Sequence, residues 1–488
     1  MEKIVVLSGA GISAESGLPT FRGEGGMWNG IDVSRVATAR AWEEDPAAVL
    51  EFYNRRRAAL RDAKPNEAHR LVAELERWYD VTVVTQNIDD LHECAGSRDI
   101  IHLHGELTLA RPEDTFNVDD GFDEAHVSRM GYDPISLGDT GGRNREQMRP
   151  HVVLFGEPVP KMGLAALRVR EADILLIVGT SLQVEPAASL YDEVSADCKV
   201  FVIDPNPSPV DGDLFVTHIF KKATDGMRDF LLKQGIDLTT VLVKKWLNID
   251  REVDEASDAA EVFYVLDEHG RCLSRTNDYG RTLFWYDASG HIARIEDINI
   301  AVRSFEYDGD GYPVRERIED GEYESVRDYK WSRDRRKVEI WGDDRVRFYY
   351  RPDGRMKHRI KGWYPPEMDE TFYKWDGRGN LIGVRSIHNY EGQTYEYNNR
   401  YSSSGRLEYW DVLGERISYA YVDDPCGNWV RMEGRKPDGR MVVLAERTIR
   451  YGNKGFSRVM APDPDGNLWT EEDIKLNNLT NQVSIPDA

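Results

Sequence analysis

The sequence predicts an α/β domain with a parallel sheet in its first half and a separate antiparallel β-repeat domain in its second half. Apolar runs alternate with helical stretches in the first half, whereas short aromatic strands punctuated by glycines recur in the second half. A polar stretch separates the two patterns. At 488 residues the chain is too long for one ordinary hydrophobic core, so at least two domains are expected.

Four apolar runs in the first half predict buried strands, at residues 4–7, 81–85, 174–178 and 200–203. Helical stretches such as residues 66–78 separate these runs. This alternation predicts a Rossmann-like parallel sheet with helices on both faces. Ligands of such sheets bind beyond the carboxyl ends of the strands, and the polar motifs of this half each follow an apolar run.

The first strand stops at two glycines in the pattern Gly9-Ala10-Gly11. Glycines allow a tight turn and a close approach of the backbone to a pyrophosphate, and the following helix directs its N-terminal amides at that anion. A tight strand-to-helix turn without a ligand is the alternative. The turn alone does not distinguish the two.

The segment after the turn and four later blocks together resemble the signature motifs of the sirtuins, the NAD-consuming protein deacylases. The blocks are Gly9-Ala10-Gly11-Ile12-Ser13 to Pro19-x-Phe21-Arg22, Thr85-Gln86-Asn87-Ile88-Asp89, His104-Gly105-Glu106-Leu107, Phe155-Gly156-Glu157 and Gly179-Thr180-Ser181-Leu182. They occur in the order of the family and at about its spacing, over roughly the first 235 residues. The resemblance implies a catalytic domain at residues 1–240, with a small lobe built from insertions at about 24–65 and 108–150.

The resemblance also implies which residues bind NAD. They are Gly9, Ala10, Gly11, Ser13, Glu15, Phe21, Arg22, Gln86, Asn87, Asp89, Gly179, Thr180, Ser181 and Asp204. Asn87 and Asp89 are expected at the nicotinamide ribose and carboxamide, where an amide or a carboxylate can hydrogen-bond; a helix N-cap is the alternative. Phe21 is expected to shield the reacting ribose carbon from water, and Arg22 to steady the loop or the phosphates. Asp204 stands where the family usually has asparagine, and its carboxylate could still accept from an adenosine ribose hydroxyl.

His104 is the residue expected to act as the catalytic base. It follows the apolar segment 100–103 and precedes Gly105, so its ring can face a cleft, and a free imidazole titrates near neutrality. Strand alternation would put His102 on the same side, so the spacing alone does not choose between the two histidines. The following glycine and the family pattern select His104.

The resemblance implies the course of the reaction. The acyl-lysine carbonyl oxygen attacks the ribose C1′ as nicotinamide leaves, His104 removes a proton from the ribose diol, and the neighbouring hydroxyl attacks the acyl carbon. Water then resolves the intermediate into free lysine and O-acyl-ADP-ribose. Asn87 and Asp89 are implied as catalytic residues beside His104.

A helical insertion at about residues 38–62 carries Tyr53 and Arg56, which lie three residues apart and so share a helix face. Class III sirtuins carry such a Tyr-x-x-Arg pair, which implies recognition of the free carboxylate of succinyl-, malonyl- or glutaryl-lysine. A guanidinium can hold a carboxylate with two hydrogen bonds, and a phenol adds a third. A solvated, arginine-rich helix face is the alternative, because Arg55 and Arg57 adjoin the pair.

Two further segments resemble those between which sirtuins bind an acylated peptide. The residues expected to bind substrate there are Val153, Phe155, Gly156 and Glu157 in the first segment and Val184 in the second. An extended peptide would pair its backbone with both segments, which gives affinity with little sequence selectivity.

The sequence departs from the family between residues 109 and 150. Most sirtuins carry four cysteines there, in two CxxC pairs that hold a structural zinc, but this segment contains none. Its aspartates do not replace thiolates at a tetrahedral zinc site. A metal-free lobe held by packing of Phe116, Phe122, Met130 and Tyr132 is therefore predicted, with carboxylate-bound calcium as an alternative.

The formal net charge of −23 argues against nucleic-acid binding, because phosphate contacts need clustered lysines and arginines. The four cysteines are scattered and form no CxxC pair, so neither a disulfide framework nor a zinc ribbon is indicated. The sequence shows no signal peptide and no run of about 18 apolar residues. A cytoplasmic protein without membrane contacts is expected.

In the second half, residues 241–260 are expected to form a polar linker, residues 261–470 a β-repeat domain and residues 471–488 a partly disordered tail. Turn glycines recur at Gly270, Gly290, Gly311, Gly354, Gly379, Gly405 and Gly427. The clearest copies are Tyr286-Asp287-Ala288-Ser289-Gly290, Tyr307-Asp308-Gly309-Asp310-Gly311 and Trp375-Asp376-Gly377-Arg378-Gly379. Each predicts a strand, a tight turn and a strand, so the repeat predicts an antiparallel β array. The copies resemble, in texture, YD (Tyr-Asp) repeats of the RHS kind, and their aromatic rows could bind a protein or a glycan or form the core of the hairpins.

These patterns favour an NAD-dependent protein-lysine deacylase, active on acetyl- and on succinyl- or malonyl-lysine and fused to a β-repeat module for targeting. An NAD hydrolase or ADP-ribosyltransferase of the defence type, regulated by the C-terminal domain, is the second hypothesis, and NAD cleavage without any peptide would distinguish it. A third hypothesis, an NAD-binding sensor without enzymatic activity, is disfavoured by the retained His104, Asn87 and Asp89.

Overall fold

The structure is a computed structural model of the chain. It describes residues 1–22, 27–28, 31–113, 116–117, 121–122, 127–142, 144–206, 210, 215–246, 259–267, 269, 271–277, 280–321, 323–341, 345–352, 355–362, 369–377, 381–388, 393–402, 407–412, 415–424, 429–435, 441–450 and 452. The chain divides into two compact units, Met1–Ile236 and Asp237–Ala488. Within the described ranges, no helix has the length and apolar character that a membrane crossing requires.

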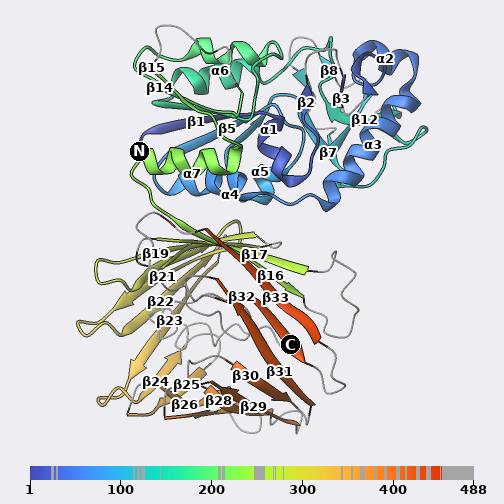
Figure 1. The fold of residues 1–488 in the computed structure, drawn as a ribbon. Helices are drawn as coiled ribbons and strands as arrows, with labels where there is room; N and C mark the ends of the chain where they lie inside the picture. The colour runs from blue at the N-terminus through green and yellow to red at the C-terminus, as the bar shows by residue number, and fades with distance from the viewer. Residues whose placement is uncertain are drawn as a thin grey trace. The chain divides into compact units, whose positions relative to one another are not determined.

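The first unit is built around a parallel sheet with the strand order β15-β14-β13-β1-β5-β6 (Figure 1). Its strands are β1 (Lys3–Ser8), β5 (Asp80–Thr85), β6 (Ile100–His102), β13 (Ile174–Val178), β14 (Lys199–Ile203) and β15 (Phe215–Ile219). Neighbouring strands all pair in parallel, so their carboxyl ends meet at one edge of the sheet. The strand order reverses beside β1, which places a topological switch point at the end of that strand. The Rossmann-like parallel sheet predicted from the sequence is confirmed.

Helices cover both faces of this sheet, α6 on one face and α4 and α7 on the other (Figure 1). The helices are α1 (Ala10–Ser13), α2 (Ala39–Glu44), α3 (Pro46–Asp62), α4 (Glu67–Glu74), α5 (Leu91–Cys94), α6 (Met162–Arg170) and α7 (Ala223–Lys233), with 3-10 turns η1 (Ala14–Ser16), η2 (Val33–Arg35), η3 (Leu75–Arg77) and η6 (Ala187–Glu193). Val200 and Val202 of β14 belong to the core cluster that includes the buried side chains of α6. Phe201, between them, meets Phe230 of α7 edge to face, with the ring centroids 5.0 Å apart. Burial on both faces explains why the strands appear in the sequence as unbroken apolar runs.

A small lobe carries α2, α3 and an antiparallel sheet of order β10-β7-β12-β11. Its strands are β7 (Gly105–Pro112), β10 (Ser128–Arg129), β11 (Thr140–Gly141) and β12 (Glu146–Val152), and short strands β2 (Phe21–Arg22), β3 (Met27–Trp28), β4 (Ile31–Asp32), β8 (Phe116–Asn117) and β9 (Gly121–Phe122) form two further ribbons. Met130 and Tyr132 pack against the hydrophobic core of the lobe, as the sequence predicted. The side chains of Phe116 and Phe122 lie outside the described residues.

Two side chains of α3 bind the backbone of this lobe. Arg57, fully buried, donates from Nε to the carbonyl of Leu107 at 2.8 Å and from a terminal nitrogen to the carbonyl of Asp133 at 3.3 Å. Asn54 accepts from the N–H of Ile135 at 2.9 Å and donates to its carbonyl at 2.8 Å. These hydrogen bonds hold β7 and the segment at 133–135 on the helix.

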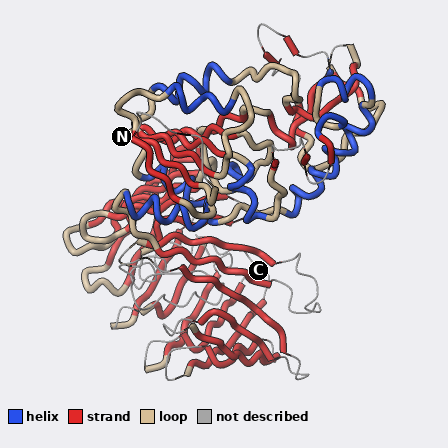
Figure 2. The backbone as a smooth tube through the Cα atoms, turned by 45° about the horizontal axis from the view of Figure 1, so that its top comes forward, coloured by secondary structure: helices blue, strands red, loops and turns tan. Residues whose placement is uncertain are grey.

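The second unit is a closed antiparallel sheet in which each strand from β16 to β33 pairs with the next and β33 pairs back with β16 (Figures 1 and 2). Its strands are β16 (Thr239–Trp246), β17 (Ala259–Leu266), β18 (Cys272–Asn277), β19 (Gly280–Tyr286), β20 (Ile292–Asp297), β21 (Ala301–Tyr307), β22 (Pro313–Asp320), β23 (Tyr323–Trp331), β24 (Lys337–Trp341), β25 (Arg345–Tyr350), β26 (Met356–Lys361), β27 (Asp369–Trp375), β28 (Leu381–His388), β29 (Gln393–Tyr401), β30 (Leu407–Val412), β31 (Glu415–Asp423), β32 (Trp429–Arg435) and β33 (Met441–Arg450). The predicted antiparallel β array is confirmed.

The Tyr-Asp turns of this sheet share one hydrogen-bond pattern. The carboxylate of Asp287 accepts from the N–H groups two and four residues later, at 2.8 and 2.9 Å, and Gly290 follows with a φ of 89°. The same arrangement recurs at Asp308 and Gly311, whose φ is 81°. The aspartate thus closes the turn, and glycine supplies the left-handed backbone that other residues adopt only with strain.

The aromatic residue before such a turn bonds to the main chain of an earlier strand. The hydroxyl groups of Tyr286 and Tyr307 donate to carbonyls 14 and 15 residues earlier, at 2.8 and 2.7 Å. The indole of Trp331, which takes the place of the tyrosine in a degenerate copy, donates to a carbonyl 18 residues earlier at 2.8 Å. Each hairpin in these copies of the repeat therefore has one aromatic side chain that is hydrogen-bonded to the main chain of an earlier strand.

The expected linker at residues 241–260 is wrong at both ends, because β16 extends to Trp246 and β17 begins at Ala259. The remainder, residues 247–258, lies outside the described residues. β16 pairs with β33, about two hundred positions along the chain, and no local pattern reveals such a partner. Residues 453–488, which include the expected tail, and the glycines at 270, 354, 379, 405 and 427 also lie outside the described residues.

Candidate active site

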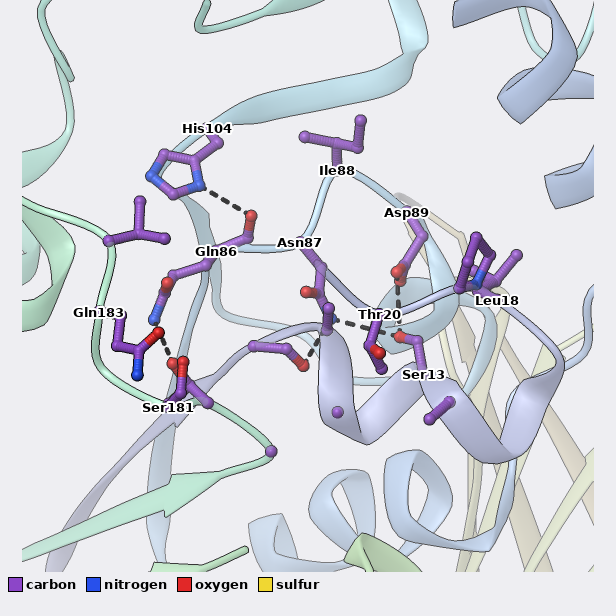
Figure 3. Close-up of a pocket in the computed structure, with 18 of the residues that line it drawn as sticks. Ser13, Leu18, Thr20, Gln86, Asn87, Ile88, Asp89, His104, Ser181 and Gln183 are labelled. Carbon is purple, nitrogen blue, oxygen red and sulfur yellow. Dashed lines mark hydrogen bonds between the residues drawn. The ribbon is translucent and has the colours of Figure 1, made fainter. Parts of the chain in front are cut away.

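A cleft of about 2040 Å³ opens at the carboxyl ends of the parallel strands (Figure 3). This volume exceeds the roughly 300–1,000 Å³ of sites for drug-sized ligands, so a dinucleotide and a second group can enter together. The residues predicted from the sequence that line it are Gly9, Ala10, Gly11, Ser13, Glu15, Tyr53, Arg56, Gln86, Asn87, Asp89, His104, Val153, Phe155, Gly156, Glu157, Gly179, Thr180, Ser181, Val184 and Asp204. Phe21 and Arg22 form β2, but their side chains lie outside the described residues.

The glycines of the first turn allow it to touch the loop after β13. A Cβ added at Gly11 would lie 2.7 Å from the Cα of Gly179, and one added at Gly9 would lie 2.6 Å from the Cβ of Thr180. The N–H groups of Gly9 and Gly11 donate to the carbonyls of Val178 and Gly179 at 3.0 and 2.7 Å. These two amides are therefore engaged by the protein, and α1 after them has only four residues. Contact between two loops is a reason for the glycines that the sequence did not reveal.

Two hydrogen bonds orient the side chain of Asn87 (Figure 3). Its Nδ2 donates to the carbonyl of Gly9 at 3.1 Å and to Oγ of Ser13 at 3.2 Å. Because the amide hydrogens are used in this way, Oδ1 is the atom that Asn87 can offer to a ligand, as an acceptor.

Asp89 lies beside Asn87 and shares the same hydroxyl. Its Oδ2 accepts from Oγ of Ser13 at 3.0 Å, and its Oδ1 accepts from the N–H of Leu91, the first residue of α5, at 3.3 Å. Burial raises the pKa of Asp89 to about 6, while the hydrogen bond from Ser13 acts in the opposite direction. At neutral pH the carboxylate is ionised and accepts hydrogen bonds.

The structure separates His104 from His102. β6 ends at His102, so the two rings do not follow strand alternation, and only His104 lies against the cleft. Nδ1 of His104 donates to the carbonyl of Gln86 at 2.9 Å, which leaves Nε2 as a proton acceptor (Figure 3). Burial lowers the pKa of His104, so the ring is neutral near pH 7.

His102 is buried and bonded to the protein through both ring nitrogens. Nδ1 lies 3.1 Å from the carbonyl of Asn87, and Nε2 lies 2.7 Å from a carboxylate oxygen of Glu93. Burial alone would lower the pKa of His102, but the hydrogen bond and charge of Glu93 outweigh it and raise the pKa. His102 thus supports the loop that carries Asn87.

Tyr53 and Arg56 of α3 line the cleft, as do Ala59 and Leu60 of the same helix. The guanidinium carbon of Arg56 lies 3.5 Å from the centroid of the Phe52 ring, which is a cation–π contact. Burial lowers the pKa of Arg56 to about 10, so the side chain is still charged at neutral pH. Tyr53 is buried, and burial raises its pKa, so its hydroxyl is a neutral donor. A solvated helix face therefore does not describe this pair.

The segments expected to bind a peptide border the cleft, but several of their groups already have partners. The backbone N–H and carbonyl of Phe155 pair with residues 37–39 at 2.9 and 3.0 Å, and the N–H of Val153 donates to the carbonyl of His104 at 2.9 Å. The carboxylate of Glu157 accepts from Arg149 at 2.8 Å. Peptide pairing along this segment stays a prediction, and Glu157 serves to shape the segment.

Two acidic residues that the sequence singled out, Glu15 and Asp204, also line the cleft. Oε2 of Glu15 accepts from the N–H of Thr224 at 3.1 Å, at the first turn of α7. Oδ1 of Asp204 accepts from the N–H and Nδ2 of Asn206 at 2.8 and 3.1 Å. Glu15 thus has a structural role, whereas Oδ2 of Asp204 can accept from a ribose hydroxyl.

The cleft also includes residues that the sequence did not single out, among them Gln183 and Lys222. Lys222 immediately precedes α7, beyond the carboxyl end of β15. Because ligands bind beyond the carboxyl ends of parallel strands, Lys222 would have been predicted as a site residue if β15 had been predicted as a strand. Gln183 has no such signal, because it lies within a loop between two predicted residues.

Among the described residues, the side chains that could hold a metal ion are Glu93, His102 and Glu106, whose ligand atoms lie within 4.8 Å of one another. In the structure His102 is hydrogen-bonded to Glu93 instead. The segment at 109–150 is described only in part, and its metal-free state stays a prediction.

A glycine turn after the first strand and a polar cleft at the switch point of a parallel sheet define a dinucleotide-binding α/β domain. A sequence model of the Sir2 family matches residues 9–186. An NAD-dependent protein deacylase of Helicobacter pylori (strain J99) is 45% identical over 233 residues, which are 48% of this chain and 95% of that protein. One of Bacteroides thetaiotaomicron is 44% identical over 237 residues, 48% of this chain and 97% of that protein. A solved complex of a Sir2 homologue with NAD is 36% identical, covers 48% of this chain and 88% of its own, and has a TM-score of 0.42. The chain belongs to the Sir2 family, the sirtuins, through its first unit.

Proposed function

We propose that the first unit is an NAD-dependent protein-lysine deacylase that removes acetyl and acidic acyl groups such as succinyl and malonyl. The products are nicotinamide, free lysine and O-acyl-ADP-ribose. The observation that carries the proposal is that one cleft is lined by His104, Asn87 and the Tyr53–Arg56 pair. The names of the relatives, NAD-dependent protein deacylases, support the activity class.

The polar groups of the cleft suit NAD as the co-substrate, which supplies an electrophilic ribose carbon. His104 is neutral and presents Nε2, so it can take a proton from a ribose hydroxyl. Asn87 and Asp89 present acceptors at the place where the sequence predicts the nicotinamide ribose and carboxamide. Asp204 can accept from the adenosine ribose at the other end.

The acidic acyl preference rests on Arg56 and Tyr53. Arg56 brings a positive charge to a cleft that α3 also lines with Ala59 and Leu60, and Tyr53 adds a hydroxyl donor. A carboxylate at the end of an acyl chain can accept from both side chains. An acetyl group has no such carboxylate, so it gains no charged hydrogen bond from the pair.

The second unit is proposed as a module that binds a protein or glycan partner and targets the deacylase. Its repeated hairpins with aromatic anchors support the resemblance to YD repeats. A lobe that binds no zinc and a cytoplasmic location complete the proposal. The charge and the scattered cysteines support the location.

Nicotinamide release by the full chain tests this function. We expect release that depends on an acylated peptide, measured with succinyl-lysine, acetyl-lysine and unmodified lysine in the same sequence. NAD cleavage without any peptide would favour an NAD hydrolase or ADP-ribosyltransferase regulated by the second unit, which the presence of that large unit makes the second candidate. Absence of turnover with every peptide would refute the deacylase proposal.

A further inference from the structure

We propose that His69 of α4 is a positioning residue for the nicotinamide end of the cleft. It fixes the direction of the Ser13 hydroxyl, which keeps Asp89 and Asn87 as acceptors toward the ligand. The inference rests on the proposed function, because it concerns how NAD is held. His69 is fully buried and does not line the cleft, so it acts through Ser13.

The hydrogen bonds of Ser13 determine which nitrogen of His69 carries its proton. A hydroxyl has one hydrogen to donate and two lone pairs to accept with. Ser13 donates to Asp89 at 3.0 Å and accepts from Nδ2 of Asn87 at 3.2 Å. Its third partner is Nε2 of His69 at 3.4 Å, and only a donor fits the remaining lone pair. His69 is therefore a neutral ring with its hydrogen on Nε2.

The other ring nitrogen of His69 agrees with this assignment. Nδ1 is buried, and within the described part of the chain it has no hydrogen-bond partner. A nitrogen that carried a hydrogen there would leave a donor unsatisfied, which costs more than an unused lone pair. Burial also lowers the pKa of His69 well below that of a free imidazole, so the ring takes up no second proton.

A second buried histidine acts in parallel on the backbone of Asn87. Oγ of Ser8 donates to Oγ1 of Thr85 at 2.9 Å, so it must accept from Nε2 of His92, also at 2.9 Å. Oγ1 of Thr85 in turn accepts from the N–H of Asn87 at 3.0 Å. The rings of His69 and His92 meet edge to face with centroids 5.0 Å apart. Two histidine-to-hydroxyl relays thus converge on the loop that would hold nicotinamide.

The state of Asp89 depends on the charged and polar groups that face it. These are Ser13 on α1, Asp90 in its own loop and His102 on β6, while His92 and Arg70 face His69. Burial favours the protonated carboxyl of Asp89, and the hydrogen bond from Ser13 favours the ionised form. A Ser13 hydroxyl that turns away therefore allows Asp89 to become protonated at a higher pH, where it donates instead of accepting.

A matched pair of substitutions separates this role from simple packing. His69→Gln keeps an N–H donor at about the position of Nε2, whereas His69→Leu has a similar volume and no donor. Asp89→Asn, which has no carboxyl to titrate, identifies the part of the pH profile that belongs to Asp89. Thermal melting of each full-length variant reports whether the fold is kept.

The experiment measures kcat and KM for NAD by nicotinamide release with an acyl-lysine peptide, from about pH 5.5 to about pH 8.5. The unmodified chain should lose kcat below about pH 6. In His69→Leu the acid limb of the kcat profile should shift up by about half a pH unit, with kcat near pH 6 reduced roughly twofold and KM for the peptide unchanged. His69→Gln should restore the original profile.

Three results would overturn the inference. The first is a pH dependence of kcat in both His69 variants whose acid limb lies at the same pH as in the unmodified chain. A second is an equal loss of kcat in the Leu and Gln variants with no movement of the limb, which would mean that His69 acts by packing alone. The third is a complete absence of nicotinamide release and of calorimetric NAD binding in the unmodified chain; this result alone also refutes the proposed function.

Discussion

Replacing Arg56 with methionine should remove most of the preference for acidic acyl groups. The guanidinium lines the cleft with its carbon 3.5 Å from the centroid of the Phe52 ring, and it is charged at neutral pH because its pKa is about 10. Methionine keeps most of the volume of the stem and can still contact the ring through its sulfur, so α3 should stay folded. What the substitution removes is the charge and its hydrogen-bond donors.

The size of the effect follows from those donors. A hydrogen bond to a charged group contributes about 1.5–3 kcal/mol, so the loss of the contact should lower kcat/KM for a succinyl-lysine peptide by about 10- to 150-fold. An acetyl-lysine peptide has no carboxylate on its acyl group, and its kcat/KM should change by less than about threefold. Tyr53→Phe, which removes one hydroxyl donor, should give a smaller loss in the same direction, about fivefold to tenfold.

The assay compares nicotinamide release from the two peptides for Arg56→Met and for a control on the same helix, Arg61→Met. Arg61 is about half exposed and hydrogen-bonds to the lobe instead of lining the cleft, so its replacement should affect neither peptide strongly. Equal losses on both peptides in Arg56→Met would show that Arg56 does not recognise the carboxylate. The acidic acyl preference would then have to be abandoned.

Four further outcomes are expected of the full chain. His104→Asn should lower kcat by about 10²- to 10⁴-fold and keep NAD binding in calorimetry; loss of binding would show that the ring has a structural role instead. Burial lowers the pKa of His92 from 6.5 to about 4. Between these two pH values the ring is protonated in the unfolded chain but not in the folded one, so the free energy of unfolding falls as the pH drops from 6.5 to 4. The melting temperature should therefore decrease between about pH 7 and about pH 5, and it should decrease less in His92→Gln than in the unmodified chain. An equal decrease in the two proteins would contradict this prediction. A chelator should leave the melting temperature unchanged, and melting induced by the chelator would refute a metal-free lobe. Arg57→Met removes the donor to the carbonyls of Leu107 and Asp133 and should lower the unfolding free energy by roughly 2–4 kcal/mol, as measured by denaturant unfolding.

The central strands of the parallel sheet could be predicted because burial on both faces leaves an unbroken apolar run. β14 is such a strand, with Val200 and Val202 on one face and Phe201 on the other. β15 was missed, because Thr217 and His218 interrupt its apolar pattern and a strand at the edge of a sheet has only one neighbour. Lys222, just beyond it, was missed for the same reason.

Asn87, Asp89, His104 and Thr180 could be placed because each follows a strand, but the bonds among the site residues could not be predicted. Ser13 meets Asp89 across 76 positions of the chain and His69 across 56, so their contact exists only in the folded unit. His69 and His92 look like ordinary helix residues in the sequence, since nothing local shows that their rings are buried against hydroxyl groups. The choice between His102 and His104 likewise depended on where β6 ends.

In the second unit, likewise, local structure could be predicted from the sequence but a long-range pairing could not. Each Tyr-Asp hairpin is specified by an aspartate, a glycine and an aromatic residue within a few positions, so the repeats were visible. Closure requires β16 to pair with β33, for example Val241 with Ile449, and no short-range signal encodes that partner. β16 was therefore mistaken for a linker.

Helix α3 links the lobe to the acyl end of the cleft. Its Arg57 and Asn54 side chains bond to the lobe backbone, and its Tyr53 and Arg56 side chains line the cleft. All four lie within two turns of one helix, so a shift of the lobe moves the carboxylate-binding pair with it. Under the proposed function, the helix that would recognise an acyl carboxylate is therefore also a helix that holds the lobe. On this helix the fully buried Arg57, which bonds to the lobe backbone, directly follows Arg56, which lines the cleft.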